Sequence, residues 1–271
     1  MKSSGRCTQM QKILAKYAAF ARVSAAQDRR QRGDLYGRVV FFAVILGIFA
    51  SLWRAVAEAG MPLAANPRAL VWYLAVTEWI LLSAPPIHIE IQEAIRRGDV
   101  AYRLGRPVSY VMAEFATGLG RLALRLPLLG ITAFACAFAF TGWIPPLRVF
   151  AMVVPFGIVA AVLLTALYLG IGLLAFWLED ISPVFWVWQK LMFVLGGLML
   201  PLTLYPNFIQ KLATLTPFPT LLAWPASFVL GTGAVTPGAL SLNLLIWSCV
   251  TGFALSSMFR RAMAEVTING G

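Results

Sequence analysis

The chain has 271 residues, of which 60% are hydrophobic and only 12% are charged. A soluble globular domain is nearer half apolar and a quarter charged, so this composition excludes an ordinary soluble protein and predicts an all-α, polytopic membrane protein. The formal net charge of +11 would suggest a nucleic-acid partner in a soluble protein. Here the basic residues cluster at the ends of apolar spans, so membrane topology explains them better and no nucleic acid is expected.

Residues 1–35 predict a basic cytoplasmic tail that contains an interfacial amphipathic helix. Within positions 11–22, one helical face gathers the apolar residues Ile13, Leu14, Tyr17, Phe20 and Ala21. A helix of this kind lies on the cytoplasmic leaflet with its basic residues in the headgroup region. The alternative is a basic, partly disordered tail. No apolar run of the signal-peptide type lies near the N-terminus, so no cleavage is expected.

Residues 36–271 predict a membrane domain with six transmembrane helices. Each crossing needs about 20 apolar residues. The expected spans are 36–56, 69–89, 122–140, 149–177, 183–204 and 240–259, with 109–121 as an amphipathic extension of the third span. The pair Pro85-Pro86 predicts a kink or an early stop in the second span. With both termini in the cytoplasm, fifteen basic residues lie inside and four outside, which satisfies the positive-inside rule.

The segment Ile91–Pro107 is the only long polar interval between two apolar spans, and it reads IQEAIRRGDVAYRLGRP. Ile91 and Ile95 at helical spacing predict a short amphipathic helix, and Asp99 is suited to cap a second short helix. Pro107 ends this second piece. Two hypotheses remain open: the segment transmits force from a soluble partner, or it is an ordinary positive loop that sets topology.

Residues 205–237 are apolar but repeatedly broken by proline. The breaks are at Pro206, Pro217, Pro219, Pro225 and Pro237. The segment is too interrupted for a normal span and too apolar for an exposed loop. It therefore predicts a re-entrant helical hairpin, entering from the outside, because broken backbone is tolerated at membrane depth only when it is packed in protein or lines a cavity.

Four ionisable residues at or near membrane depth are candidates for a polar path: Glu78, Glu114, Arg121 and Arg125. Charges there are costly unless they are paired or face water. We expect Glu78 to pair with Arg121 or Arg125 across helices, as the wall of a substrate path or as a lock between helices. In the alternative, Glu114, Arg121 and Lys190 sit at the interface and reach it by snorkelling.

Motifs for chemistry are missing from the sequence. It has no GxxxxGK[ST] phosphate loop, no HExxH and no CxxC pair, and His88 is its single histidine. We therefore predict no catalytic residue, no metal site and no cofactor bound by this chain. His88 is interpreted as a polar residue at the membrane interface.

Two blocks carry a resemblance to a known family. IRRGDVAYRLGRPVSY (Ile95–Tyr110) has Gly-Asp, then Leu, then Arg-Pro-Val-Ser, and FVLGGLMLPLTLYP (Phe193–Pro206) has a Gly-Gly, Pro and Tyr-Pro spacing. With the six spans, the polar elbow and the broken hairpin, the chain resembles the ABC-2 type permeases, and more closely those grouped with viologen and multidrug exporters. The resemblance covers nearly the whole chain.

The resemblance implies the permease subunit of an ABC-2 type exporter in the bacterial inner membrane, which is not itself an enzyme. Two permease halves, identical or related, would stand on two ATPase subunits that bind ATP and Mg. The segment 91–107 would couple to the ATPase, and the hairpin 205–237 would form an outer gate. The path would run between the halves, lined by the first, second and fifth spans, for an amphipathic or lipid-like substrate. The implied coupling residues are Ile95, Arg96, Arg97, Asp99, Arg103 and Arg106.

Two other functions compete with this interpretation. A stand-alone secondary transporter or channel is disfavoured because the sequence has no evident inverted repeat and few carboxylates inside its spans. An intramembrane lipid-modifying enzyme would need His, Asp or Cys residues clustered at one depth, and no such cluster is found.

Overall fold

The computed structural model describes residues 2–30, 32–60, 66–105, 108–233 and 235–269, which form helices joined by turns, with no strand among them. The predicted all-α class is therefore confirmed. The helices are α1 (Lys2–Arg30), α2 (Arg32–Glu58), α3 (Pro67–Ser83), α4 (Ile87–Arg96), α5 (Asp99–Leu104), α6 (Tyr110–Thr141), α7 (Leu147–Leu173), η1 (Leu174–Phe176), α8 (Ser182–Leu195), η2 (Leu202–Leu204), α9 (Asn207–Thr214), α10 (Phe218–Leu221), α11 (Ala223–Leu230) and α12 (Pro237–Asn269).

Five helical stretches within the described part of the chain are long and apolar enough to cross a membrane. They are Gly33–Glu58, Pro67–Arg96, Tyr110–Thr141, Leu147–Phe176 and Pro237–Ala264. These correspond to five of the six predicted spans. The remaining one, predicted at 183–204, contains α8, whose 14 residues end before Gly196. At 1.5 Å per residue, a helix of this length covers about 21 Å of a hydrocarbon core about 30 Å thick.

The chain turns at Gly197, which has a φ of +62° that glycine adopts without a Cβ penalty. The Gly197 carbonyl accepts a hydrogen bond from the hydroxyl of Tyr73 on α3, at 2.6 Å. The end of α8 is thereby tied to the middle of the bundle.

α3 forms the centre of the bundle. In its most apolar stretch 83% of the residues are buried, against 22% for α2 and for α12. It packs against α2, α6, α7 and α11. Trp79 of α3 donates a hydrogen bond to the carbonyl of Leu126, at 2.8 Å. A Cβ at Gly157 of α7 would lie 2.5 Å from the Trp79 ring, so glycine at this position makes room for the indole.

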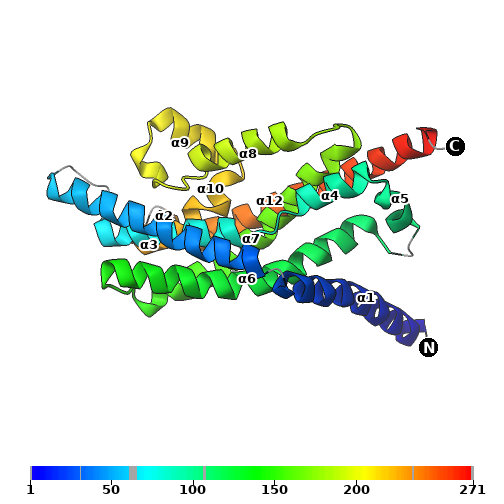
Figure 1. Ribbon diagram of the computed structural model, residues 1–271, viewed down its shortest axis with the longest axis horizontal. Helices are drawn as coiled ribbons and strands as arrows, with labels where there is room; N and C mark the ends of the chain where they lie inside the picture. Colours follow the sequence, from blue (N-terminus) through cyan, green and yellow to red (C-terminus); the bar gives the residue numbers. More distant parts are fainter. Residues whose placement is uncertain (1, 31, 61–65, 106–107, 234, 270–271) are drawn as a thin grey trace.

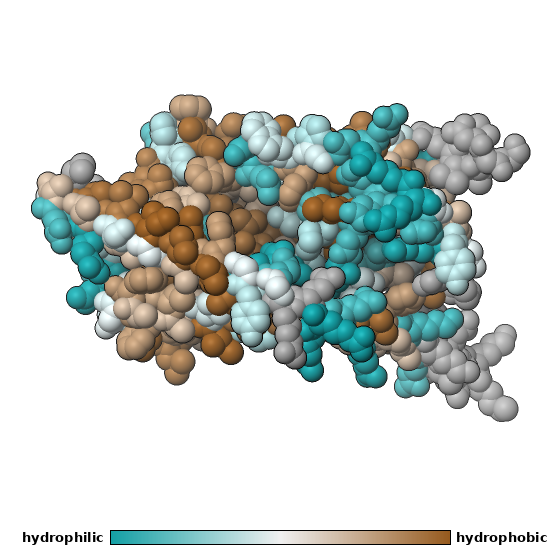
Figure 2. Space-filling view, viewed as in Figure 1, coloured by the Kyte–Doolittle hydropathy of each residue, from teal (hydrophilic) through white to brown (hydrophobic). Residues whose placement is uncertain are grey.

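The elements at the two ends of the molecule differ in character. Figure 1 shows α4, α5 and both chain termini at the same end, whereas α9 lies toward the other end. In Figure 2, hydrophilic residues gather over the half that holds α1, α4 and α5, while hydrophobic residues cover much of the other half. This distribution suits a molecule with one polar end and an apolar body.

Prolines mark the boundaries of helices in two regions, as the sequence predicts. α3 ends at Ser83 and α4 begins at Ile87, with Pro85-Pro86 between them. In the proline-broken stretch, Pro206 and Pro217 lie directly before α9 and α10. Pro219 and Pro225 lie buried in α10 and α11, and α11 packs on α3 and α7. Within this stretch, α10 and α11 therefore pack against the central helices.

Candidate functional site

The polar segment between the second and third spans forms two short helices, α4 and α5, joined by a tight turn. Gly98 has a φ of +77° in this turn, a left-handed conformation that favours glycine. Ile91 and Ala94 bury one face of α4, whereas Glu93 and Arg97 are exposed. The predicted amphipathic helix is confirmed. The expected cap is wrong: Gly98 occupies the N-cap position, and Asp99 is the first helical residue with no capping hydrogen bond.

The structure separates the predicted coupling residues by what their side chains contact. Arg97 and Asp99 are exposed, and Arg97 pairs with Glu93 of its own helix at 2.8 Å. Ile95 is half-buried, and Arg106 lies outside the described residues. Arg96 donates through Nε to the carbonyl of Glu179 at 2.9 Å, and Arg103 pairs with Glu114 at 2.7 Å. The side chains of Arg96 and Arg103 therefore hold this segment to the rest of the chain, whereas those of Arg97 and Asp99 do not within its described part.

α4 is joined to the start of α8 by polar contacts. The amide of Gln92 donates to Asp180 at 3.1 Å, and its oxygen accepts from the backbone N–H of Ile181 at 3.2 Å. The same Asp180 oxygen accepts from the hydroxyl of Ser182 at 2.7 Å and from its backbone N–H at 3.0 Å. These hydrogen bonds hold the pKa of the Asp180 carboxyl below its usual range, and the two from Ser182 contribute most.

Ion pairs connect α1, α4 and α6, and they correct one prediction; the Arg125–Asp28 pair is buried, whereas the side chain of Glu90 is 38% exposed. Arg125 donates to Asp28 through Nε at 2.8 Å and through Nη2 at 2.6 Å, and Nη2 lies 3.1 Å from Asp34. Arg121 pairs with Glu90. The expected pairing of Glu78 with Arg121 or Arg125 is therefore wrong, because acids from α1, α2 and α4 reach these arginines instead.

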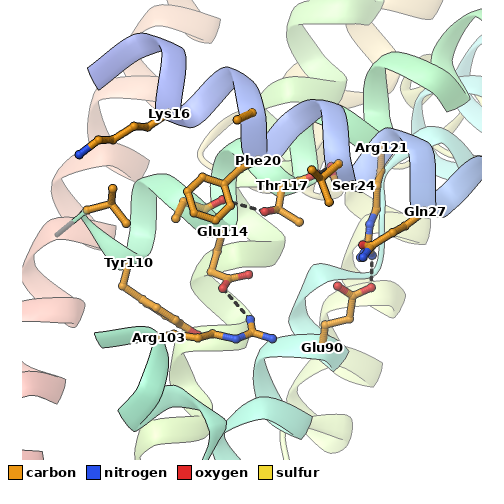
Figure 3. Close-up of a pocket in the computed structure, with 14 residues that line it drawn as sticks. Lys16, Phe20, Ser24, Gln27, Glu90, Arg103, Tyr110, Glu114, Thr117 and Arg121 are labelled. Atoms are coloured by element: carbon orange, nitrogen blue, oxygen red, sulfur yellow. Dashed lines mark hydrogen bonds and ion pairs between the residues drawn. The ribbon is translucent and has the colours of Figure 1, made fainter. Parts of the chain in front are cut away.

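A cavity of about 650 Å³ lies between α1, α5 and α6. Figure 3 shows that two ion pairs, Arg103–Glu114 and Arg121–Glu90, lie within it. Lys16 and Phe20 of α1 face it from the other side. Its arginines are already matched to carboxylates, so the cavity is a polar junction between helices.

A second cavity, of about 420 Å³, lies between α2, α3 and α8 and contains Glu78. Glu78 is only 2% exposed, and no hydrogen bond or ion pair joins its carboxylate to another described residue. His88 also lines this cavity; it is buried, and neither ring nitrogen has a partner in the described part of the chain. The interpretation of His88 as an interface residue is wrong, because its ring stacks on Phe185 of α8 with centroids 3.8 Å apart.

The walls of this cavity are largely apolar and aromatic. Besides Glu78 and His88 it is lined by Phe41, Tyr168, Phe185, Met192, Phe193 and Met199, among others, with Arg38, Gln189 and Lys190 as further polar residues. Arg38 pairs with Asp34 at 3.0 Å, and the ammonium of Lys190 lies 5.3 Å from the centroid of the Trp186 ring. Glu78 is thus the carboxylate in an otherwise apolar and cationic lining.

A protein-family model described as ABC-2 family transporter protein matches residues 69–270. The chain belongs to this family. The match takes in α4, α5 and α8 and the cavity wall at Glu78, whereas α1 and α2 lie outside it. No curated protein matches the chain. The resemblance inferred from the sequence is therefore confirmed, and the chain is a multi-pass permease of an ABC-type transporter.

Sequence reasoning gave no role to Gln92 and Asp180 of this permease and did not pair His88 with α8; the structure joins Gln92 to Asp180 and His88 to Phe185. Their contacts join positions about 90 residues apart, and no local pattern pairs them. One signal was present for Gln92. It sits beside Ile91 on an amphipathic helix, and a polar residue next to the buried face often has a hydrogen-bond partner.

Proposed function

We propose that this permease is the transmembrane subunit of an ABC-2 type exporter, driven by separate ATPase subunits that bind ATP and Mg. The observation that carries the proposal is the α4–α5 pair, which presents the exposed charges of Arg97 and Asp99 at the polar end of the molecule. A short, structured element between two spans suits a soluble partner better than a loop that only sets topology. The position of this element inside the family match supports the same conclusion.

The proposed topology has six crossings with both termini in the cytoplasm of a bacterial inner membrane. α8, together with residues 196–204, serves as the fifth crossing, and residues 205–237 form a re-entrant hairpin that acts as the outer gate. Two findings support this arrangement: both termini lie at the end that holds α4 and α5, and α11 packs on the central helices.

Two permease halves, identical or related, stand on two ATPase subunits in the proposed complex. α2 and α8 expose large apolar side chains that a second permease or lipid must cover. They include Val40, Val44, Ile48, Trp186, Val187 and Leu191. The cavity with Glu78 lies between these helices and α3, so it serves as the permease's contribution to the substrate path. Its aromatic and apolar walls suit an amphipathic or lipid-like substrate.

In the proposed mechanism, ATP closes the ATPase dimer and displaces α4 and α5. The ATPase can drive the permease between its conformations only if α4 and α5 bind the open and the closed ATPase with different free energies. Exposed charges at Arg97 and Asp99 are suited to such contacts because they change partners at little cost in folding stability.

The test is to purify the chain from native membranes in mild detergent and to identify the proteins that accompany it. We expect a stoichiometric ATP-binding protein, which is lost in the double variant R97E/D99K while the permease stays folded. The matched control is K211E, a charge reversal on α9, which should keep the partner. A chain that purifies alone and transports in vesicles with an ion gradient, without ATP, would overturn the proposal in favour of a secondary transporter.

A further inference from the structure

We infer that Gln92 is a positioning residue that fixes the start of α8 to α4, so that the two move together and α8 carries the wall of the Glu78 cavity with it. This inference rests on the proposed function, since it explains how movement of the α4–α5 segment reaches the substrate path. It concerns a connection within this chain and involves no contact between Gln92 and ATPase or substrate.

The first observation is a stripe of contacts along α4. His88, Gln92 and Arg96 are spaced four residues apart, so they lie on one face of the helix. His88 stacks on Phe185, Gln92 bonds Asp180 and Ile181, and Arg96 bonds the carbonyl of Glu179. Successive turns of α4 therefore contact residues 185 down to 179 in order, which fixes the register between the two segments.

Gln92 is the central contact of this stripe, and it is 8% exposed. Its amide donates to Asp180 and accepts from the N–H of Ile181, a residue that is itself 1% exposed. A buried backbone N–H without a partner is costly, so the side-chain oxygen of Gln92 satisfies a donor that needs one. An amide side chain carries both a donor and an acceptor, so Gln92 alone donates to the carboxylate and accepts from the N–H.

The second observation is that few polar contacts other than these hold the start of α8. Among the described helices, α8 packs mainly against α9 and α10, and Phe185 also lies against Tyr168 of α7. Asp180 holds the first N–H of α8 through Ser182, so the Gln92–Asp180 bond reaches the helix itself. The stripe on α4 is therefore the main polar connection between the start of α8 and the bundle.

The third observation is a break between α3 and α4. α3 ends at Ser83, and Ala84 is extended with a ψ of 126° before Pro85-Pro86. This break allows α4 to change its angle to α3 without bending a helix. Glu78 lies on α3, whereas Phe185, Met192 and Phe193 of the opposite wall lie on α8. A displacement of α4 that carries α8 therefore changes the width of the cavity.

Movement of α8 is measured with spin labels on Val44→Cys of α2 and Val187→Cys of α8, both exposed. The three native cysteines are replaced by serine, and labelled chains are diluted with unlabelled ones in complexes that retain the native ATPase. In the parent chain we expect trapping with ATP and vanadate to shift the distance between the labels. We expect Q92L to abolish the shift, and Q27L, the same substitution at an exposed residue of α1, to keep it.

Hydrogen exchange in the permease without its ATPase tests the connection separately. We expect exchange in the 179–185 segment to be about tenfold faster in Q92L, because one buried hydrogen bond is lost. We expect Q92E to give a partial loss of the ATP-driven shift, and D180N to restore it in the double variant, since the new amide donates to the new carboxylate. This rescue also covers the case in which Q92L does not fold.

The outcomes separate the two hypotheses. Faster exchange in Q92L with an unchanged ATP-driven shift overturns the role of Gln92 and leaves the proposed function intact. Unchanged exchange in Q92L, or a double variant Q92E/D180N no better than Q92E, also overturns it. A parent complex that retains its ATPase but shows no ATP-driven shift overturns the role of Gln92 alone. A parent chain that purifies without any ATP-binding partner overturns the proposed function, and the role of Gln92 falls with it.

Discussion

The guanidinium of Arg125 on α6 donates two hydrogen bonds, of 2.8 and 2.6 Å, to the carboxylate of Asp28 on α1. Both side chains are at most 2% exposed, and 97 positions of sequence separate them. A paired charge of this kind is stable only while both partners are present. The contact therefore fixes α1 to α6 at the point where α1 ends and α2 begins.

Removing one partner of this pair should be strongly destabilising. We expect Arg125→Met to cost about 3–5 kcal/mol, because it leaves Asp28 buried and uncompensated. The double variant R125M/D28L removes both charges and should recover much of that loss. The measurement is unfolding in detergent micelles, with R29M at an exposed site of α1 as the control. If R125M is as stable as R29M, the pair does not hold α1.

Gly120 gives a second test of the α1–α6 contact. A Cβ at this position would lie 2.0 Å from the carbonyl oxygen of Ala21 and 2.4 Å from the hydroxyl of Ser24. Backbone cannot yield as a flexible side chain does, so Gly120→Ala should push α1 away from α6. We expect lower thermal stability and faster proteolysis of α1, measured by limited trypsin digestion.

The control for this substitution is Gly252→Ala on α12, where a Cβ would meet nothing within 4 Å. Alanine is favoured over glycine inside a helix by about 0.5–1 kcal/mol, so G252A should be neutral or stabilising. Equal behaviour of the two variants would contradict the close approach of α1 and α6 at Gly120.

The predictable parts of this fold are those that local sequence determines. Apolar runs located five of the spans, and Pro85-Pro86 located the end of α3. The sequence predicts one continuous span at 183–204, whereas α8 ends at Leu195 and Gly197 adopts a positive φ. The glycine pair is the local signal for this break, but the apolar residues on both sides of it favour a continuous span.

The contacts of the candidate site were less predictable because they depend on distant segments. The sequence marked Arg121 and Arg125 as costly charges that needed partners, which is correct. Its choice of Glu78 was wrong, because nothing in the local pattern places Asp28 of α1 or Glu90 of α4 beside α6. The same limit applies to Gln92 and Asp180, which 88 positions of sequence separate.

The exposed charges of the α4–α5 segment should affect the ATPase partner and leave the fold intact. We expect R97E and D99K to change the free energy of unfolding by no more than about 0.5 kcal/mol, as for other surface substitutions. Both should reduce co-purification of the ATPase and permease-dependent ATP hydrolysis. R103E is expected to differ, because it also breaks the pair with Glu114 and so lowers stability. If R97E or D99K lost as much stability as R103E, then Arg97 or Asp99 would also hold the fold together, which would contradict a role limited to the ATPase partner.

Glu78 is expected to serve the substrate path at some cost to stability. Its carboxylate is buried beside apolar residues and has no partner among the described residues, so the amide of Glu78→Gln should be easier to bury than the charge. We expect E78Q to unfold at the same or a higher temperature than the parent chain, while ATP-driven transport in vesicles changes. Glu58→Gln, at the exposed end of α2, is the control for removing one carboxylate. A marked fall in the unfolding temperature of E78Q alone would mean that the carboxylate has a structural partner in the assembled transporter, and Glu78 would then belong to an interface between subunits and not to the path.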